Sequence, residues 1–236
     1  MNTAWHTRPM AAFDVETTGL DVEGDRIVTA ALWRIDPAHR SKEVTTWFAD
    51  PGIEIPAEAT EIHGVTTEQA RAEGRPAADV VPEIAAALEA VVSEGLPVVV
   101  YNAPYDLTLL DRELALHRPG RPLKVQPLVV DPLVLDKRVD TFRRGSRKLV
   151  DVCAHYRVPL AQEEAHGAAA DALAAARLAW RIATAHPEIA EMTAEELHAA
   201  QVAWKAEQSA SFQEYLRRRD PDAVVDGSWP MIAAPA

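Results

Sequence analysis

The fold is decided by the stretch Met10-Ala-Ala-Phe-Asp-Val-Glu-Thr17, which alternates loosely between apolar and polar residues and leads into Thr18-Gly19. This pattern is typical of a strand that runs into a turn. Residues two positions apart in a strand point to the same face, so Asp14 and Glu16 are expected to project side by side. Burying acids without partners costs on the order of several kcal/mol each. A cation is therefore expected beside the pair; the open alternative is a solvent-facing acidic pair at a strand edge.

The chain up to about residue 185 alternates between strands and helices. Two more strands are predicted over Ile27 to Ile35 and Val44 to Phe48, which form an antiparallel meander with the first. The elements predicted after them are a helix over Pro76 to Glu94, a buried strand over Leu96 to Tyr101, a helix over Ala103 to His117, a strand over Pro127 to Leu135, and helices over Arg147 to Tyr156 and Ala168 to Ala185. This order predicts an α/β domain with a mixed five-stranded sheet flanked by helices.

We expect two parts along the chain, residues 1–186 as one domain and 187–236 as a helical C-terminal extension with a tail. The extension begins at Thr193-Ala-Glu-Glu196, which has the pattern of a capping box, and its helix is expected to end near Arg219. The apolar side chains of this helix are too many for a helix free in solvent: Leu197, Trp204, Phe212, Tyr215 and Leu216. They either pack on the chain's own domain or form an interface.

The composition excludes several classes of protein. The chain has 236 residues with 48% hydrophobic and 25% charged side chains, a balance typical of globular proteins. Cys153 is the only cysteine, which excludes a disulfide framework, and no apolar run approaches the ~18 residues of a membrane span. Residues 1–10 lack the pattern of a signal peptide, so we expect a cytoplasmic protein without a membrane partner. The net charge of −12 disfavours coating of duplex DNA, but carboxylates can bind metals that then meet phosphates.

Two further acids follow at a distance along the chain. Asn102 ends a predicted buried strand and is a favoured helix N-cap, and Asp106 lies one turn later, where it can face the C-terminal edge of the sheet. His166 and Asp171 open the Ala-rich helix. Five helical positions are about 140° apart, so His166 must lie in the preceding loop if both serve one site. Each motif alone also has an ordinary alternative: a capped helix whose Asp106 favours the positive end of the dipole, and a histidine at a helix start with an unrelated Asp171 on the helix face.

Together, these motifs resemble the Asp-Glu-Asp-Asp-His (DEDDh) family of 3′–5′ exonucleases, which includes the proofreading epsilon subunit of bacterial DNA polymerase III. The resemblance covers roughly Met10 to Ala185, with the three motifs at Phe13 to Leu20, Tyr101 to Leu110 and His166 to Asp171. A further local match is Glu61-Ile-His-Gly-Val-Thr66. The resemblance implies a ribonuclease-H-like fold and hydrolysis of nucleotides from the 3′ end of DNA, in proofreading or repair.

The resemblance also implies a two-metal-ion mechanism. Asp14, Glu16 and Asp171 would hold the catalytic ion, Asp14 would bridge to the second, and Asp106 would support it through water. Oxygen-only ligands suit Mg²⁺ or Mn²⁺. His166 would take a proton from the attacking water, since an unperturbed histidine titrates near 6.5. The four acids and His166 are thus the expected catalytic residues.

By the same resemblance, the 3′ end of a single strand would be bound by Thr17, Thr18, Leu20, His63 and Asn102. Leu20 would wedge against the last bases; His63 has the alternative role of a loop histidine that satisfies backbone groups. The chain departs from the family at Tyr101, where histidine is frequent, and has an aromatic Tyr105 before the motif-two acid. These departures bear on how the terminal nucleotide is held.

Alternatives remain for the substrate and the partner. The same chemistry on RNA ends or oligonucleotides, and a non-catalytic interaction module on this fold, are the competing functions. The C-terminal helix is a candidate contact to a DNA polymerase or to a second copy of the chain. Basic residues concentrate at one place, either as a solvated loop or as a track for a single strand: Lys137, Arg138, Arg143, Arg144, Arg147 and Lys148.

Overall fold

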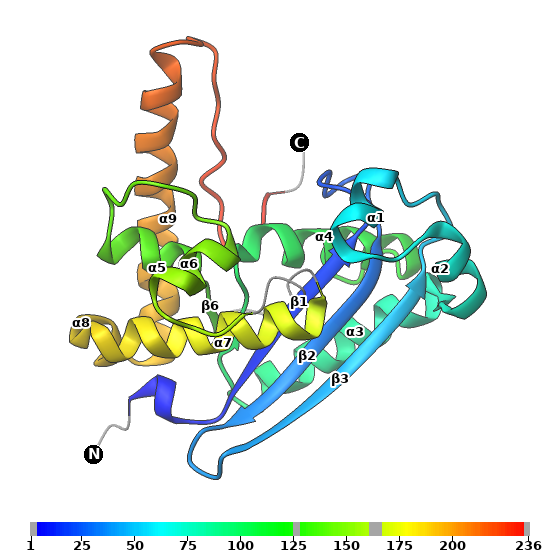
Figure 1. The fold of residues 1–236 in the computed structure, drawn as a ribbon, viewed down its shortest axis with the longest axis horizontal. Helices are drawn as coiled ribbons and strands as arrows, with labels where there is room; N and C mark the ends of the chain where they lie inside the picture. The colour runs from blue at the N-terminus through cyan, green and yellow to red at the C-terminus, as the bar shows by residue number, and fades with distance from the viewer. Residues whose placement is uncertain (1–3, 125–127, 161–166, 234–236) are drawn as a thin grey trace.

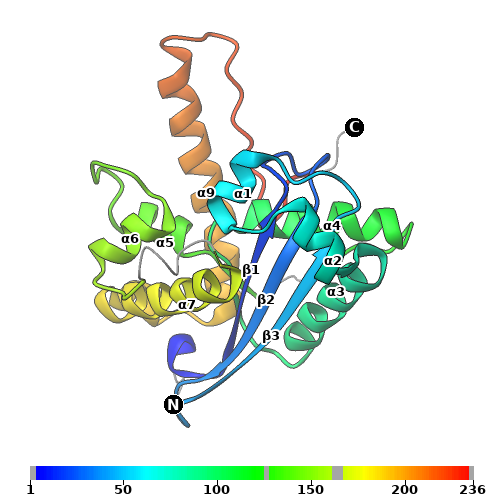
Figure 2. The ribbon, with the colours of Figure 1, turned by 45° about the vertical axis from the view of Figure 1, so that its right-hand side comes forward.

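The computed structural model describes residues 4–124, 128–160 and 167–233 as a twisted sheet with helices against both faces (Figures 1 and 2). Three long antiparallel strands form its centre: β1 (Met10–Thr17), β2 (Ile27–Asp36) and β3 (Ser41–Asp50). Asp14 of β1 lies opposite Ala31 of β2. The pairing register shifts between Glu16 and Thr17, so an irregularity ends β1 next to the acidic pair.

Short parallel strands complete the sheet in the order β4-β3-β2-β1-β5-β6. β5 (Val98–Val99) pairs with β1, and β6 (Val129–Val130) pairs with β5. β4 (Arg75–Pro76) pairs with β3 and is a sixth strand that the sequence does not predict. Two residues that end in proline carry no alternating apolar pattern, which explains why this strand was missed. The mixed sheet flanked by helices is as expected.

Helices cover the two faces of the sheet. One face carries α3 (Ala77–Ser93) and α4 (Ala103–His117), and the other carries α7 (Ala168–Ala185). The remaining helical segments are η1 (Trp5–Thr7), α1 (Ala57–His63), α2 (Thr67–Glu73), α5 (Pro132–Val139), α6 (Leu149–His155), α8 (Pro187–Ala190) and α9 (Ala194–Arg217). Two buried clusters result, one between the sheet and α3 with α4, and the other between the sheet and α7.

The predicted strand over Pro127 to Leu135 is wrong in its second half. After β6 the chain turns into α5, because Asp131 accepts a hydrogen bond from the Leu133 N–H at 2.9 Å and Pro132 occupies the first helical position. An acid that caps a helix and a proline at its first position are start signals. They fell inside an apolar run that reads equally well as a strand.

The C-terminal extension lies partly on the domain and partly away from it. The start of α9 is buried at Leu197, and its capping box at Thr193 is formed. The distal part projects outward (Figure 1), where Phe212 and Tyr215 are half exposed. The chain then returns as a tail whose Trp229 is buried. Of the apolar residues of this helix, Leu197 thus packs on the domain, whereas Phe212 and Tyr215 face solvent.

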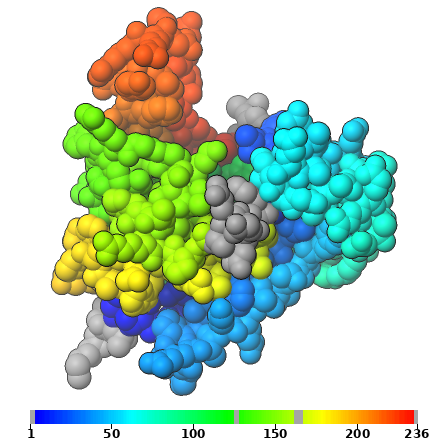
Figure 3. Space-filling model, in the orientation of Figure 1, coloured from blue at the N-terminus to red at the C-terminus, as the bar shows by residue number. Residues whose placement is uncertain are grey.

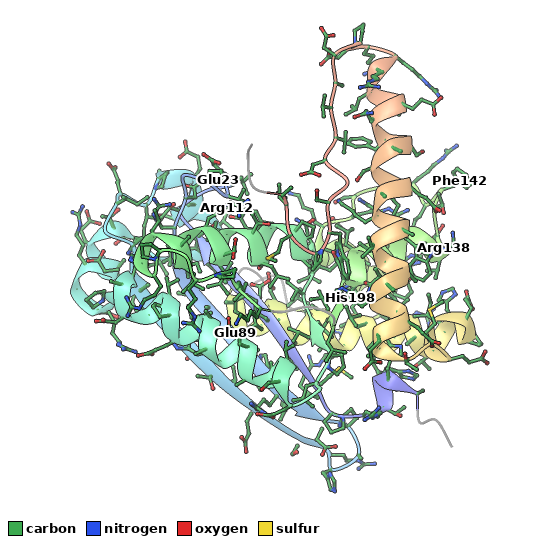
Figure 4. All side chains as sticks on the ribbon, turned by 180° about the vertical axis from the view of Figure 1, so that it is seen from behind. Glu23, Glu89, Arg112, Arg138, Phe142 and His198 are labelled. Atoms are coloured by element: carbon green, nitrogen blue, oxygen red, sulfur yellow. The ribbon has the colours of Figure 1, made fainter. Side chains whose placement is uncertain are left out.

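The tail is held by specific contacts. Trp229 packs against the ring of His198, at 4.8 Å between ring centres, and its indole N–H donates to Asp131. The Ile232 N–H donates to the Thr108 hydroxyl on α4 at 2.8 Å. Arg112 donates to the Ile232 carbonyl and pairs at 2.8 Å with Glu23 in the turn after β1 (Figure 4). The tail thereby contacts the helix that carries Asp106.

Within the described ranges, no helix has both the length and the apolar character to cross a bilayer.

Candidate active site

Three of the predicted acids converge at one end of β1. Asp14 and Glu16 project from the same face of the strand, as its period requires, and Asp171 meets them from the first turn of α7. One carboxylate oxygen from each residue lies within 4.8 Å of the others. The acids of motifs one and three are therefore brought together from opposite parts of the sequence.

Asp106 lies beside this set. It sits in the first turn of α4, is buried, and accepts a hydrogen bond from the Val15 N–H at 3.2 Å. Its charge is the strongest electrostatic influence on Asp14 after burial itself. Asp106 stands outside the three-acid group but adjoins it through Asp14 and the backbone of β1.

Burial and mutual repulsion perturb these acids. The pKa of Asp14 is raised well above its usual value by burial first, and then by the charges of Asp106, Glu16 and Asp171. Burial and the Asp171 charge raise the pKa of Glu16 to about 7. No lysine or arginine in the described part of the chain pairs with Asp14 or Glu16. These carboxylates offer only oxygen ligands and carry an unbalanced negative charge, so the set fits a divalent cation.

His166 falls outside the described residues, so its predicted role stays a prediction. The first residue described after it is Gly167, which directly precedes α7. The placement of Asp171 on the helix agrees with the requirement that a histidine serving the same site come from the loop before it.

The turn after β1 presents the predicted substrate contacts. The Thr18 hydroxyl donates to Asp25 at 2.7 Å and accepts from the Arg26 N–H, which fixes the turn. Leu20 is 87% exposed, which is unusual for a large apolar side chain. The turn also lines a cavity of about 340 Å³ whose walls include Glu16, Leu20, Ile62 and His63.

His63 has both ring nitrogens engaged with backbone groups. Nε2 lies 3.2 Å from the Thr17 carbonyl and Nδ1 accepts from the Val65 N–H at 3.2 Å. Burial lowers the pKa of His63, which favours the neutral ring that this pair of bonds requires. The backbone-satisfying role weighed from the sequence is therefore present, and a substrate contact remains a prediction.

Asn102 does not cap α4 with its side chain, contrary to expectation. Its backbone is left-handed, with φ of 60°, and no side-chain capping bond is formed. Instead Asp131 accepts from the N–H groups of Asn102 and Ala103, at 2.9 and 3.0 Å. Gln201 of α9 accepts from the Asp131 N–H in turn. Asp131 thus holds the start of the helix that carries Asp106, a role that no local pattern indicates beyond its cap at α5.

Tyr105 is a second residue whose contacts were not foreseen. Its hydroxyl lies 2.5 Å from that of Thr17, and both hydroxyls reach the Gly19 carbonyl. The ring also lines the cavity beside His63. Motif two therefore ties the turn that bears Leu20 to the acid-bearing helix.

Three of the six concentrated basic residues have partners within the protein. Arg143 and Arg147 both pair with the fully buried Asp136. Arg138 lies over the ring of Trp204, 5.2 Å from its centre. Arg143 and Arg147 therefore have a structural partner, whereas Arg144 and Lys148 are exposed, so a track for a single strand along this run stays a prediction. Phe142 in the same loop is 93% exposed and points away from the body of the molecule (Figure 4).

Comparison with known proteins agrees with this geometry. The exonuclease family model RNase_T matches residues 11–179, a span that contains all three motifs. A DNA polymerase III subunit epsilon-like protein from Rhodobacter capsulatus is 39% identical over 103 residues, which cover 43% of this chain and 14% of the relative. These matches confirm the resemblance drawn from the motifs.

Solved structures of exonuclease I share the fold. One, whose structure was described as suggesting how processivity is achieved, superposes with a TM-score of 0.65 at 18% identity, over 87% of this chain and 46% of the other. The Escherichia coli enzyme with a dT13 oligonucleotide gives 0.63 at 18% identity, over 77% and 42%. The enzyme from Methylocaldum szegediense gives 0.60 at 19%, over 88% and 46%. The chain thus spans less than half the length of these proteins, and the likeness confirms the ribonuclease-H-like fold.

Proposed function

Because this chain belongs to the exonuclease family, we propose that it removes nucleotides from the 3′ end of single-stranded DNA by metal-dependent hydrolysis. The observation that carries the proposal is the convergence of Asp14, Glu16 and Asp171 within 4.8 Å, with Asp106 adjoining. All four acids of the family pattern are retained, which disfavours the non-catalytic module. Proofreading or repair is the proposed setting, in the cytoplasm.

The acids are the proposed metal ligands. Asp14, Glu16 and Asp171 would hold the catalytic ion, Mg²⁺ or Mn²⁺, and Asp14 would also reach a second ion that Asp106 supports through water. When bound, such ions lower the pKa of a coordinated water and stabilise the leaving oxygen. The raised pKa values of Asp14 and Glu16 mean that cation binding competes with protons at these carboxylates.

His166 is the proposed general base. In the sequence it directly precedes Gly167, the residue before α7, as expected of a base that serves the same site as Asp171. A neutral imidazole at pH 7 can accept a proton from the attacking water. Replacement by Ala is expected to preserve metal binding and to lower the rate.

The cavity beside Glu16 is the proposed place for the terminal nucleotide. Its volume of about 340 Å³ and its apolar walls suit a base and sugar. Leu20 would wedge against the neighbouring base, with Thr17, Thr18, His63 and Asn102 around the sugar and phosphate. Exonuclease I has been crystallised with dT13 and dA16 oligonucleotides, which supports DNA as the substrate class.

Digestion of matched oligonucleotides tests the proposal. A 5′-labelled single-stranded DNA is expected to shorten stepwise from its 3′ end with Mg²⁺ or Mn²⁺ and to stay intact with a chelator. Faster digestion of RNA of the same sequence would assign an exoribonuclease instead. No digestion of either polymer by protein that binds metal would contradict the proposed hydrolysis. A 3′-mismatched duplex digested faster than a paired one would support proofreading, and co-elution with a DNA polymerase would test that partner.

A further inference from the structure

A groove separate from the acidic site lies between the outer surface of α7 and the loop that joins β2 to β3. Its volume is about 510 Å³, within the range of ligand-binding clefts. In Figure 3 the strands in blue run beside α7 in yellow, and residues of the β2–β3 loop and of α7 line the groove together. The described residues that line the groove include none of the four acids and none of those that line the cavity beside Glu16. The groove is therefore distinct from the proposed catalytic centre.

The floor of the groove is aliphatic. It is formed by buried or partly buried side chains from β1, β2, α7 and the segment after α6, among them Met10, Ile35, Val158 and Leu173. Trp180 stands at the rim with 38% of its surface exposed. An apolar floor of this kind favours a ligand that inserts a bulky apolar side chain.

The rim is positively charged, in a protein whose net charge is −12. Four cationic side chains line the groove: Arg40, Lys42, Arg177 and Arg181. None of them forms an ion pair with a carboxylate of the described residues. Asp36 is the acid in the lining, and it pairs with His39 at 2.6 Å. Charge complementarity therefore calls for an acidic ligand.

Two of these cations are held in place by aromatic rings. Lys42 lies 5.2 Å from the centre of the Trp33 ring, and Arg181 lies 5.6 Å from the centre of Trp180. Such contacts restrict the cations and leave their hydrogen-bond donors available. The Trp180 ring is partly covered by Arg181, and the floor offers no second aromatic platform. Single-stranded nucleic acids are usually bound by stacking on several rings, so these features favour a peptide.

From these contacts we infer that the groove binds an acidic peptide segment of a partner protein, with a bulky apolar side chain between its acids. The apolar side chain enters the space over Leu173 and Val158. The acidic side chains meet Arg177 and Arg181 on one wall and Arg40 and Lys42 on the other. Binding there is independent of hydrolysis and leaves the acidic site open.

The test uses a fluorescein-labelled eight-residue peptide that repeats aspartate, glutamate and leucine, with binding followed by anisotropy at low ionic strength. Saturable binding is expected, and the double variant Arg177→Glu/Arg181→Glu is expected to weaken it at least about tenfold. Arg218→Glu/Arg219→Glu makes the same change of charge at exposed positions after α9 and should bind as the parent does. Far-UV circular dichroism confirms that both variants are folded.

A second readout places the peptide in the groove. In ¹H–¹⁵N spectra, the indole N–H signal of Trp180, identified by its loss in Trp180→Phe, is expected to shift on titration. Equal weakening in both double variants, equal binding of a peptide with serine in place of leucine, or an unmoved Trp180 signal would overturn the inference. Tighter binding of an eight-nucleotide oligothymidylate that shifts the same signal would assign the groove to nucleic acid. Self-association abolished by Arg177→Glu/Arg181→Glu would assign it to a second copy of the chain. Either result would also contradict the proposal that the groove binds an acidic peptide.

Discussion

Two acidic groups in this protein differ in how their negative charge is balanced: the buried Asp136, and the partly buried acids at the end of β1. At Asp136 the carboxylate is fully buried and receives two guanidinium groups, from Arg143 and Arg147. At the end of β1, Asp14 and Glu16 face another carboxylate and have no basic side chain of the described residues as a partner. Arginines of the protein balance the charge of Asp136, whereas the acids at the end of β1 can be balanced by a bound cation.

This difference separates acids that hold the structure from acids that bind a ligand. Paired acids fix loops: Asp136 anchors the segment from Asp140 to Lys148, since Arg147 also donates to the Asp140 carbonyl. Burial and mutual repulsion raise the pKa values of Asp14 and Glu16, so we expect the charged cluster to disfavour folding when no cation is bound. The two groups should therefore respond in opposite directions when one carboxylate is neutralised.

The largest expected effect is on catalysis at the clustered acids. Asp14→Asn should lower the rate of 3′-end hydrolysis by at least about a thousandfold, because a metal-holding oxygen is worth several kcal/mol in the transition state. The rate is measured on labelled single-stranded DNA with Mn²⁺. Asp79→Asn, at an exposed position of α3, is the matched control and should retain full activity. Comparable rates for Asp14→Asn and the control would refute the site.

The largest effect on stability is expected at the paired acid. Asp136→Asn should lower the free energy of unfolding by about 3–5 kcal/mol, because two partly buried arginines lose their counter-charge. Urea unfolding of metal-free protein measures it. In the same assay Asp14→Asn should be neutral or stabilising, since it removes repulsion. If Asp14→Asn is instead the more destabilising of the two, the distinction between the groups fails.

A smaller effect is the pH dependence of the metal-free protein. Burial raises the pKa of Glu16 and of Glu113 to about 7, against 4.5 for an ordinary glutamate. Each folded carboxyl then holds its proton more tightly than the unfolded chain does, so its contribution is favourable below pH 4.5 and is lost as the pH rises through 7. The Tm should therefore fall between pH 5 and pH 8.

The two glutamates give a matched pair for this prediction. Glu16→Gln and Glu113→Gln should each flatten the fall in Tm, because each removes one titrating group. Added Mg²⁺ should raise the Tm of Glu113→Gln at pH 8, because Glu113 bonds to the Ile27 N–H and is not one of the proposed metal ligands. It should raise the Tm of Glu16→Gln much less. Equal responses to Mg²⁺ would place the cation elsewhere.

The smallest effect is expected from Tyr105→Phe. The substitution keeps the ring against the cavity but removes the hydroxyl that reaches Thr17 and Gly19. One such bond is worth about 1 kcal/mol, so KM for single-stranded DNA should rise by roughly fivefold with little change in kcat. Steady-state kinetics measures both constants. A fall in kcat at constant KM would contradict a role in holding the turn.

The parts of the fold and of the site that could be predicted from the sequence are those that depend on local patterns. Strand period alone places Asp14 and Glu16 on one face, and helix period places Asp171 on α7. The long strands and the longer helices were predicted for the same reason. β4 and α5 were missed, because a two-residue strand has no pattern and an apolar run that contains a cap reads as a strand.

The rest could not be predicted because it depends on tertiary contacts. Asp131 accepts from Asn102, 29 residues earlier, and from Trp229 in the tail, which no local pattern encodes. The pairing of Arg143 with the buried Asp136 likewise has no signal in the basic run itself, and it makes this arginine a structural anchor. The family resemblance identified which acids meet, but not which neighbours hold them.

The central claim is that the carboxylates at the end of β1 form one site for divalent cations. Titration of the metal-free protein with Mn²⁺, followed by calorimetry at pH 7.5, tests it most directly. The account predicts saturable binding that Asp14→Asn abolishes and Glu113→Gln leaves intact. Binding of Mn²⁺ by Asp14→Asn with the affinity and stoichiometry of the parent protein would contradict it.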